Sequence, residues 1–176
     1  IWRSLVGSEM CIRDSLYGLA LAFKKNNNFN EGLASLDKLL EKYPKNLVLN
    51  TTKVEFLSYF NKFNDALDLA NKFLEISPKN YPLSISKSQI LLNMGQYFES
   101  EEIIRDQLLR KNDSPELWFM LSETQKTSQN IVGYHQSRAE YFLLLGQDEK
   151  ALNQLEFALQ LTQNNFQVSD RIMTKI

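Results

Sequence analysis

The sequence predicts an all-α protein, a right-handed α-solenoid of about ten helices arranged as hairpins, and three observations predict it. Apolar residues recur at the i, i+3, i+4 and i+7 spacing of an amphipathic helix, as in Leu16, Leu19 and Phe23. The triplets that begin at Pro44 and Pro78 both read Pro-Lys-Asn, at a sequence spacing of 34. No segment alternates polar and apolar residues in the manner of a half-buried strand.

The turn signals divide this pattern into successive helices. Asn26 to Asn28, Asn46, Asn61 to Asn64, Asn93 to Gly95 and Gly146-Gln147 carry the residue types that favour turns. Ser114 before Pro115 has the form of an N-cap followed by proline at the first helical position. We therefore expect helices over residues 16–25, 29–42, 47–59, 63–76, 81–93, 97–110, 115–127, 131–145, 148–162 and 166–175.

Small residues predict how these helices cross. Ala20 and Gly32, Ser88 and Ser100, and Ala139 and Ala151 form pairs with a constant sequence spacing of 12, and Val54 with Ala66 keeps the spacing. Two antiparallel helices can approach closely only where such side chains face each other. The pair at Ala139 lies half a repeat out of phase with the earlier ones, because the spacing from Ser100 to Ala151 is 51, or 34 plus 17. Which face the helix over 131–145 presents is left open by the sequence.

Composition excludes several classes of partner. The chain has 176 residues with 43% apolar content, which corresponds to one domain or a short repeat array. Its 20 Lys and Arg residues balance 21 Asp and Glu residues, so we expect no nucleic-acid partner, which would need a clustered basic surface. No apolar run reaches the roughly 18 residues of a membrane span.

No catalytic constellation is present in the sequence. A zinc protease needs a His-Glu-x-x-His helix, whereas the single histidine, His135, is followed by Gln136, Ser137 and Arg138. One histidine and one cysteine also leave nothing for a triad, and no glycine pattern matches a phosphate-binding loop. We expect no enzyme activity, no metal and no cofactor in these residues. His135 is expected to be partly buried or to form an inter-helix hydrogen bond, and Trp118 to be a packing residue.

The first residues do not fit the helical pattern. Residues 5–15, which read Leu-Val-Gly-Ser-Glu-Met-Cys-Ile-Arg-Asp-Ser, are identical to the in-frame translation of a transposon-type sequencing adapter. We interpret 1–15 as non-native and expect the native chain to start near Leu16. The apolar face of the helix over 16–25 (Leu16, Leu19 and Phe23) should then be exposed. The expected organisation is a repeat domain over 16–164 and a capping helix over 165–176, held by Phe166 and Ile172.

The repeating marks resemble the tetratricopeptide repeat, a 34-residue helical hairpin. Leu19-Ala20, Phe23, Phe29 and Pro44 occupy matching positions in the first repeat. Phe63, Ala66 and Pro78 follow in the second, Gly95 and Tyr97 in the third, and Trp118 with Leu121 opens a fourth. The hairpin with the most complete set of marks is the last: Ala139, Phe142, Gly146, Ala151, Leu155 and Ala158.

The end of the chain has a more specific resemblance. Pro115-Glu-Leu-Trp118, the run from Tyr134 to Gly146, the run from Ala151 to Leu159, and the run from Phe166 to Ile172 are similar to the C-terminal repeat domain of BepA-like periplasmic zinc metalloproteases, the β-barrel assembly-enhancing proteases. The resemblance implies a periplasmic, non-catalytic module that docks a protease onto outer-membrane assembly machinery, with zinc in a catalytic domain outside this sequence. The alternative is a stand-alone adaptor or scaffold, cytoplasmic in that case.

The remaining function is binding of a protein or peptide. In a repeat stack the first helix of each hairpin lines the concave face. A carboxylate clamp of the Lys/Asn type is not expected, because its positions hold Thr51, Glu55, Ile85 and Gln89. A mixed polar and aromatic groove suits an extended or helical peptide. The candidate groove residues are Thr51, Glu55, Tyr59, Gln89, Asn93, Phe119, Glu123, Lys126, Gln136 and Glu140.

Overall fold

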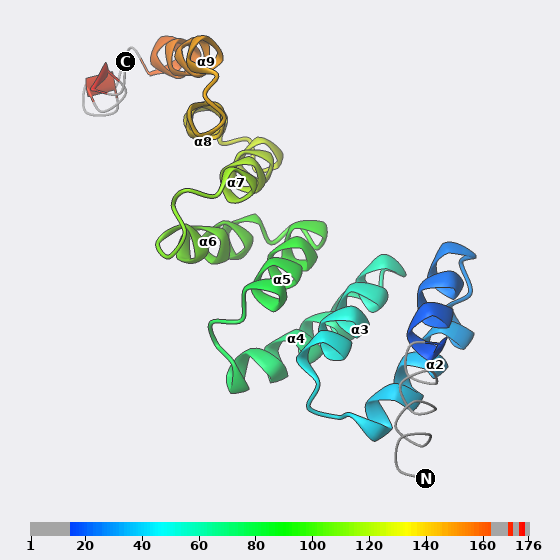
Figure 1. Ribbon diagram of the computed structural model, residues 1–176. Helices are drawn as coiled ribbons and strands as arrows, with labels where there is room; N and C mark the ends of the chain where they lie inside the picture. Colours follow the sequence, from blue (N-terminus) through cyan, green and yellow to red (C-terminus); the bar gives the residue numbers. More distant parts are fainter. Residues whose placement is uncertain (1–14, 163–168, 171–172, 175–176) are drawn as a thin grey trace. The chain divides into compact units, whose positions relative to one another are not determined.

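The computed structural model describes residues 15–162, 169–170 and 173–174 (Figure 1). Within these residues the chain forms helices and turns and contains no strand, which confirms the all-α prediction. Residues 15–25 are helical. The helices that follow are α2 (Phe29–Lys42), α3 (Leu47–Tyr59), α4 (Phe63–Ile76), α5 (Tyr81–Asn93), α6 (Tyr97–Leu108), α7 (Pro115–Thr127), α8 (Ile131–Leu144) and α9 (Asp148–Leu161).

The predicted bounds of α2, α3, α4, α5 and α7 agree with the structure at both ends. α8 and α9 each end one residue early, and α6 ends at Leu108, two residues before the predicted end. Leu109 is almost fully exposed, so no packing holds the last turn in α-helical form. The Arg110 amide donates instead to the Gln107 carbonyl at 3.1 Å, three residues back.

Two predictions about the ends of the chain fall largely on residues that lie outside the described part. Of the proposed adapter segment only Ser15 is described, and it is already helical. Of the expected capping helix, residues 169, 170 and 173 are helical. The Ser169 hydroxyl donates to the Thr162 carbonyl at 2.8 Å, which ties this segment to the end of α9. Phe166 and Ile172 lie outside the described residues.

The chain divides into two compact units, residues 1–90 and 91–176. In the first unit α2 packs on α3, and α3 packs on α4. Ala20, Leu36 and Phe56 form a buried cluster, and the rings of Phe29 and Phe60 pack against it. The ring centroids of Phe29 and Phe56 are 5.9 Å apart, and those of Phe56 and Phe60 are 4.9 Å apart. The predicted small residues Ala20, Gly32, Val54 and Ala66 are all buried.

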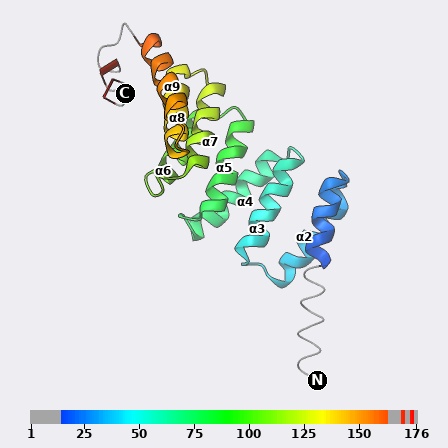
Figure 2. The ribbon, with the colours of Figure 1, turned by 45° about the horizontal axis from the view of Figure 1, so that its top comes forward.

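In the second unit α6 packs on α7, α7 on α8, and α8 on α9 (Figure 2). The buried cluster of Ala139, Ala151, Leu155 and Ala158 lies between α8 and α9, as the small-residue spacing predicts. α8 therefore packs on both neighbours. It is the second helix of one hairpin and the first helix of the next, which accommodates the half-repeat shift.

One turn geometry recurs through both units. Asn27, Asn61, Gly95 and Gln129 all have positive φ, at a constant sequence spacing of 34. At each turn the next amide donates to a carbonyl five residues back, as Asn28 does to Phe23 at 2.8 Å and Asn130 to Gln125 at 2.8 Å. This is the Schellman type of helix end. Gly146 repeats the turn only half a repeat after Gln129, at the junction of α8 and α9.

The proline-containing turns use side-chain caps. Asn46 accepts from the Leu49 amide at 3.1 Å, and Asn80 accepts from the Leu83 amide at 3.0 Å. Ser114, one full repeat after Asn80, occupies the predicted N-cap position before Pro115 but makes no side-chain cap bond. Its hydroxyl is buried and has no hydrogen-bond partner within the described structure.

Candidate functional site

Part of the predicted groove lies on one face of the first unit, formed by the helix over 15–25, α3 and α5. The Glu55 Oε1 on α3 accepts a long hydrogen bond of 3.5 Å from the Ser86 hydroxyl on α5. Tyr59, one turn after Glu55, is 53% exposed, and the Lys24 Nζ lies 5.0 Å from its ring centroid. Gln89 is exposed and lies one turn after Ser86. The structure thus brings Glu55, Tyr59 and Gln89 onto adjoining helices.

Thr51 and Asn93 are placed differently from these three residues. Thr51 is buried, and its hydroxyl donates to the Leu47 carbonyl at 2.8 Å within α3. Its hydroxyl is therefore committed to its own helix. Asn93 is exposed at the end of α5, where the chain has entered the second unit.

A second cluster of predicted residues lies on the hairpin of α7 and α8. We name the α7–α8 face by its six residues: Phe119, Glu123, Lys126, Tyr134, Arg138 and Tyr141. Because α7 and α8 run antiparallel, each turn forward along α7 faces one turn backward along α8, so three pairs of residues meet across the hairpin. The rings of Phe119 and Tyr141 are 5.4 Å apart. Glu123 Oε1 and Arg138 Nη1 are 3.5 Å apart, and the Lys126 Nζ lies 5.9 Å from the Tyr134 ring centroid.

Arg138 lies at the centre of this face. Its guanidinium carbon is 4.6 Å from the ring centroid of Phe119, 5.3 Å from Tyr141 and 5.6 Å from Phe142. Three rings therefore surround a planar cation, an arrangement that combines stacking with cation–π attraction. The groove prediction does not include Arg138 and Tyr141. Tyr134, Arg138 and Tyr141 on α8 have the same sequence spacing, four and then three residues, as Phe119, Glu123 and Lys126 on α7. This shared spacing could have identified Arg138 and Tyr141 from the sequence.

Gln136 and Glu140 are the other predicted groove residues on α8. Helical positions two residues apart point about 200° apart, so these two side chains lie on a different side of α8 from Arg138. Both are half-buried. The structure does not bring them together with Phe119 and Glu123.

A buried polar network supports the hairpin from beneath. Gln125 is almost fully buried, and its Nε2 donates to Glu101 Oε1 on α6 at 3.0 Å. Its Oε1 accepts from the Ser137 hydroxyl on α8 at 2.7 Å. Glu101 also accepts two hydrogen bonds from Arg105. Because every member is satisfied, the network fixes the positions of α6, α7 and α8 relative to one another.

His135 and Trp118 occupy structural positions. His135 Nδ1 forms a hydrogen bond of 2.9 Å with Gln154 Oε1, so the histidine links α8 to α9 as the sequence predicts. Trp118 is half-buried, and its indole Nε1 donates to the Asn112 carbonyl at 2.8 Å across the preceding turn.

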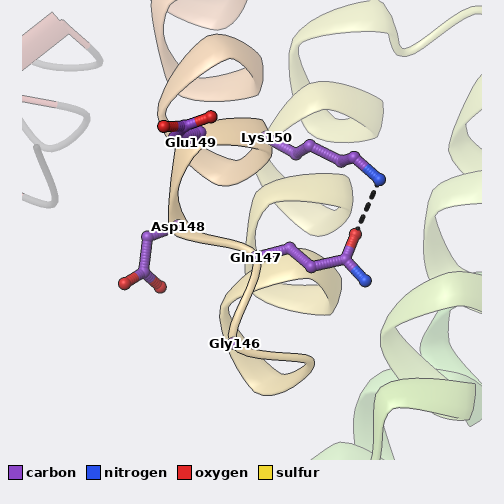
Figure 3. Close-up of a pocket in the computed structure, with 5 residues that line it drawn as sticks. All are labelled: Gly146, Gln147, Asp148, Glu149 and Lys150. Atoms are coloured by element: carbon purple, nitrogen blue, oxygen red, sulfur yellow. Dashed lines mark hydrogen bonds between the residues drawn. The ribbon is translucent and has the colours of Figure 1, made fainter.

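Two open depressions on the described part of the surface lie apart from these residues. One of ≈ 410 Å³ lies at the turn between α8 and α9 and is lined by residues 146–150 (Figure 3). There Lys150 donates to Gln147 Oε1 at 2.9 Å, while the Asp148 side chain points away from that pair. Another of ≈ 500 Å³ lies beside residues 95–99, with Glu101 and Ser128. Neither depression is lined by a predicted groove residue.

None of the helices in the described part of the chain combines the length and the apolar character that a membrane span requires. Among the described side chains no group of three or more histidine, cysteine, aspartate or glutamate residues is placed to hold a metal ion.

Comparisons with known proteins agree with this architecture. The family model described as tetratricopeptide repeat matches residues 14–46. A comparison with curated protein sequences gives no significant match.

Solved structures of tetratricopeptide-repeat proteins have a similar fold. MamA from Desulfovibrio magneticus RS-1 aligns over 88% of this chain and 97% of its own, with a TM-score of 0.59 and 12% identity. A tetratricopeptide repeat protein from Parabacteroides merdae aligns over 92% and 72%, with a TM-score of 0.59 and 12% identity. A thermophilic TPR protein of Thermus thermophilus aligns over 92% and 97%, with a TM-score of 0.55 and 13% identity. At these identities the similarity establishes the fold alone.

Proposed function

We propose that this protein is an interaction module whose repeats bind a segment of a partner protein. The proposal is based on large aromatic side chains that are exposed to solvent on helix faces outside the buried core. Tyr59 and Phe119 are 53% and 38% exposed, and each has a cation placed over its ring. Tyrosine, tryptophan and arginine dominate the binding energy of protein interfaces. The chain would act as an adaptor or scaffold, without chemistry of its own.

The test is a selection of binding partners followed by measurement of affinity. A random peptide display library is selected on the purified chain, and the enriched peptides are synthesised and titrated by calorimetry. We expect one-to-one binding that weakens at least tenfold, about 1.4 kcal/mol, when Tyr59→Ala and Phe119→Ala are combined. Phe98→Ala is the matched control, because Phe98 is 71% exposed but lies on α6 and is not one of the predicted groove residues. Failure to select any peptide would contradict the proposal.

The residue succession between Pro115 and Ile172 favours a second, more specific function. Because it resembles the end of BepA-like proteases, we propose as the alternative that the chain is the C-terminal repeat domain of a periplasmic zinc metalloprotease. Its partners would then be outer-membrane assembly machinery, and zinc would be held by a different domain.

The complete coding sequence tests this alternative most simply. A His-Glu-x-x-His helix encoded upstream in the same reading frame, together with release of the full-length protein by osmotic shock, would support it. An upstream region made only of further repeats, or retention of the protein inside spheroplasts, would exclude it and leave the adaptor function in place.

A further inference from the structure

From the α7–α8 face we infer the chemistry of the partner: it binds a peptide segment in which an acidic residue lies next to an apolar one. The inference rests on the proposed function and specifies which face acts and what it recognises. It depends on how the cations of this hairpin are held, on the hydrogen bonds that they lack, and on the apolar surface beside them.

The cations of the hairpin contact mainly aromatic rings. Lys126 lies over Tyr134, and Arg138 lies among three rings. Among the described contacts, Glu123 is the carboxylate that pairs with one of these cations, Arg138. Glu116, one turn before Phe119 on α7, is the other carboxylate on that side of the helix. Lys126 and Arg138 are thus balanced by Glu116 and Glu123 on this face, so recognition of an acid depends on the hydrogen bonds that Arg138 lacks.

Arg138 is only partly compensated by Glu123. Their closest atoms are 3.5 Å apart, longer than the roughly 2.7–2.9 Å of a charge-assisted hydrogen bond. The Arg138 Nη1 is buried without a hydrogen-bond partner in the described structure. A buried donor of this kind is costly and calls for an acceptor. The Glu123 side chain is 41% exposed and can move closer to Nη1, while the Arg138 side chain as a whole is 21% exposed, which leaves part of it accessible to a partner carboxylate.

The rings provide the apolar part of the site and also hold the cation. Phe119 is 38% exposed beside Arg138, so an aliphatic or aromatic side chain next to the acidic residue can pack on it. Because Phe119, Tyr141 and Phe142 hold the guanidinium plane from several sides, Arg138 loses little conformational freedom when a ligand binds. A fixed planar fork recognises a carboxylate better than a flexible ammonium group does.

The experiment starts from the peptides selected on the full chain. We expect them to be enriched in aspartate or glutamate adjacent to leucine, phenylalanine or tyrosine. The best peptide is synthesised together with a copy in which each acid is replaced by its amide. The amide copy should bind about tenfold more weakly, equivalent to about 1.4 kcal/mol, and the affinity of the acidic peptide should fall with added salt.

Variants of the chain then locate the site. Arg138→Gln should weaken the acidic peptide at least tenfold, and Arg138→Lys should be intermediate because it keeps the charge but loses the planar stacking. Arg110→Gln is the matched control, because Arg110 is an exposed arginine of the same unit that pairs with Asp106 on α6. Lys126→Glu changes only an exposed side chain and provides a second variant if Arg138→Gln fails to fold.

The outcomes separate this inference from the proposed function. Peptides that bind without acidic enrichment, or that keep their affinity in Lys126→Glu and in folded Arg138→Gln, would overturn the inference. If such peptides depended instead on Tyr59, the chain would still be an interaction module. A selection that yields no peptide at all would overturn both.

Discussion

The ring of Phe56 on α3 lies directly against Gly32 on α2, so closely that the position excludes any side chain. A β-carbon on Gly32 would be 2.5 Å from Cζ and 2.6 Å from Cε2 of Phe56, and 3.2 Å from Cβ of Phe23. The ring is itself fixed in the core with Phe29 and Phe60. Close approach of α2 and α3 in the first unit therefore depends on a single missing methyl group.

We expect Gly32→Ala to destabilise the protein by about 2 kcal/mol, because the phenyl ring cannot move without disturbing the core. The matched control is Gly18→Ala in the helix over 15–25, where a β-carbon would meet nothing within 4 Å. That change should stabilise by about 0.5–1 kcal/mol through helix propensity. Urea unfolding of both variants measures the difference. Equal effects at the two glycines would contradict the packing described here.

The recurring left-handed turn position gives a second prediction. Gln129 holds φ at 62°, where Gly95 and Gly146 stand in equivalent turns. A non-glycine residue with this φ destabilises the folded state by about 1–2 kcal/mol. Glycine removes this strain, but part of the gain is lost because glycine also gives the unfolded chain more conformational freedom. Gln129→Gly should therefore raise the free energy of unfolding by about 0.5–1 kcal/mol.

The reverse substitution serves as its control. Gly146→Ala places a side chain at φ 67° and should lose about 1 kcal/mol. Thermal melts followed by circular dichroism distinguish the two directions, and a loss of stability in Gln129→Gly would be inconsistent with the turn geometry.

The N-caps at equivalent repeat positions should respond differently to alanine. Asn46→Ala should cost about 1 kcal/mol, because its side chain accepts the Leu49 amide. Ser114→Ala should change stability by less than about 0.5 kcal/mol, because the buried hydroxyl makes no cap bond in the described structure. Chemical denaturation of both variants tests the contrast. A loss at Ser114 as large as that at Asn46 would show that the serine does cap α7.

The Gln125 network is expected to couple three helices. Gln125→Met should destabilise by about 2 kcal/mol, because Ser137 and Glu101 each lose a buried partner. In a double-mutant cycle, Ser137→Ala should cost less in the Gln125→Met background than in the natural protein. Strictly additive effects would mean that the two side chains do not interact.

The sequence predicts most helix bounds because turn residues lie on both sides of the helices. At α3, for example, the turn residues Asn46 and Asn61 flank the helix, and both ends agree with the structure. The predicted end of α6 is wrong because Leu109 continues the apolar pattern although nothing packs on it. Periodicity indicates which residues could be buried, but it does not show whether a neighbouring helix covers them.

The candidate site is only partly accessible to sequence reasoning for a similar reason. Repeat phase assigns Phe119, Glu123 and Lys126 to one side of α7, and these do lie on one face. The half-repeat shift leaves the orientation of the next helix undetermined, so the sequence points to Gln136 and Glu140 instead of Arg138 and Tyr141. Only the packing of α8 between α7 and α9 fixes which of its sides meets Phe119.

The most direct measurement of whether this chain is an interaction module is the NMR spectrum of its aromatic side chains on titration with a selected peptide. Binding should shift the ring resonances of Phe119, Tyr134 and Tyr141, or that of Tyr59, while the ring of Phe98 on α6 stays unchanged. Shifts at Phe98 with none at the other four rings would contradict the assignment of these faces, and no shift of any ring at saturating peptide would contradict the binding function itself.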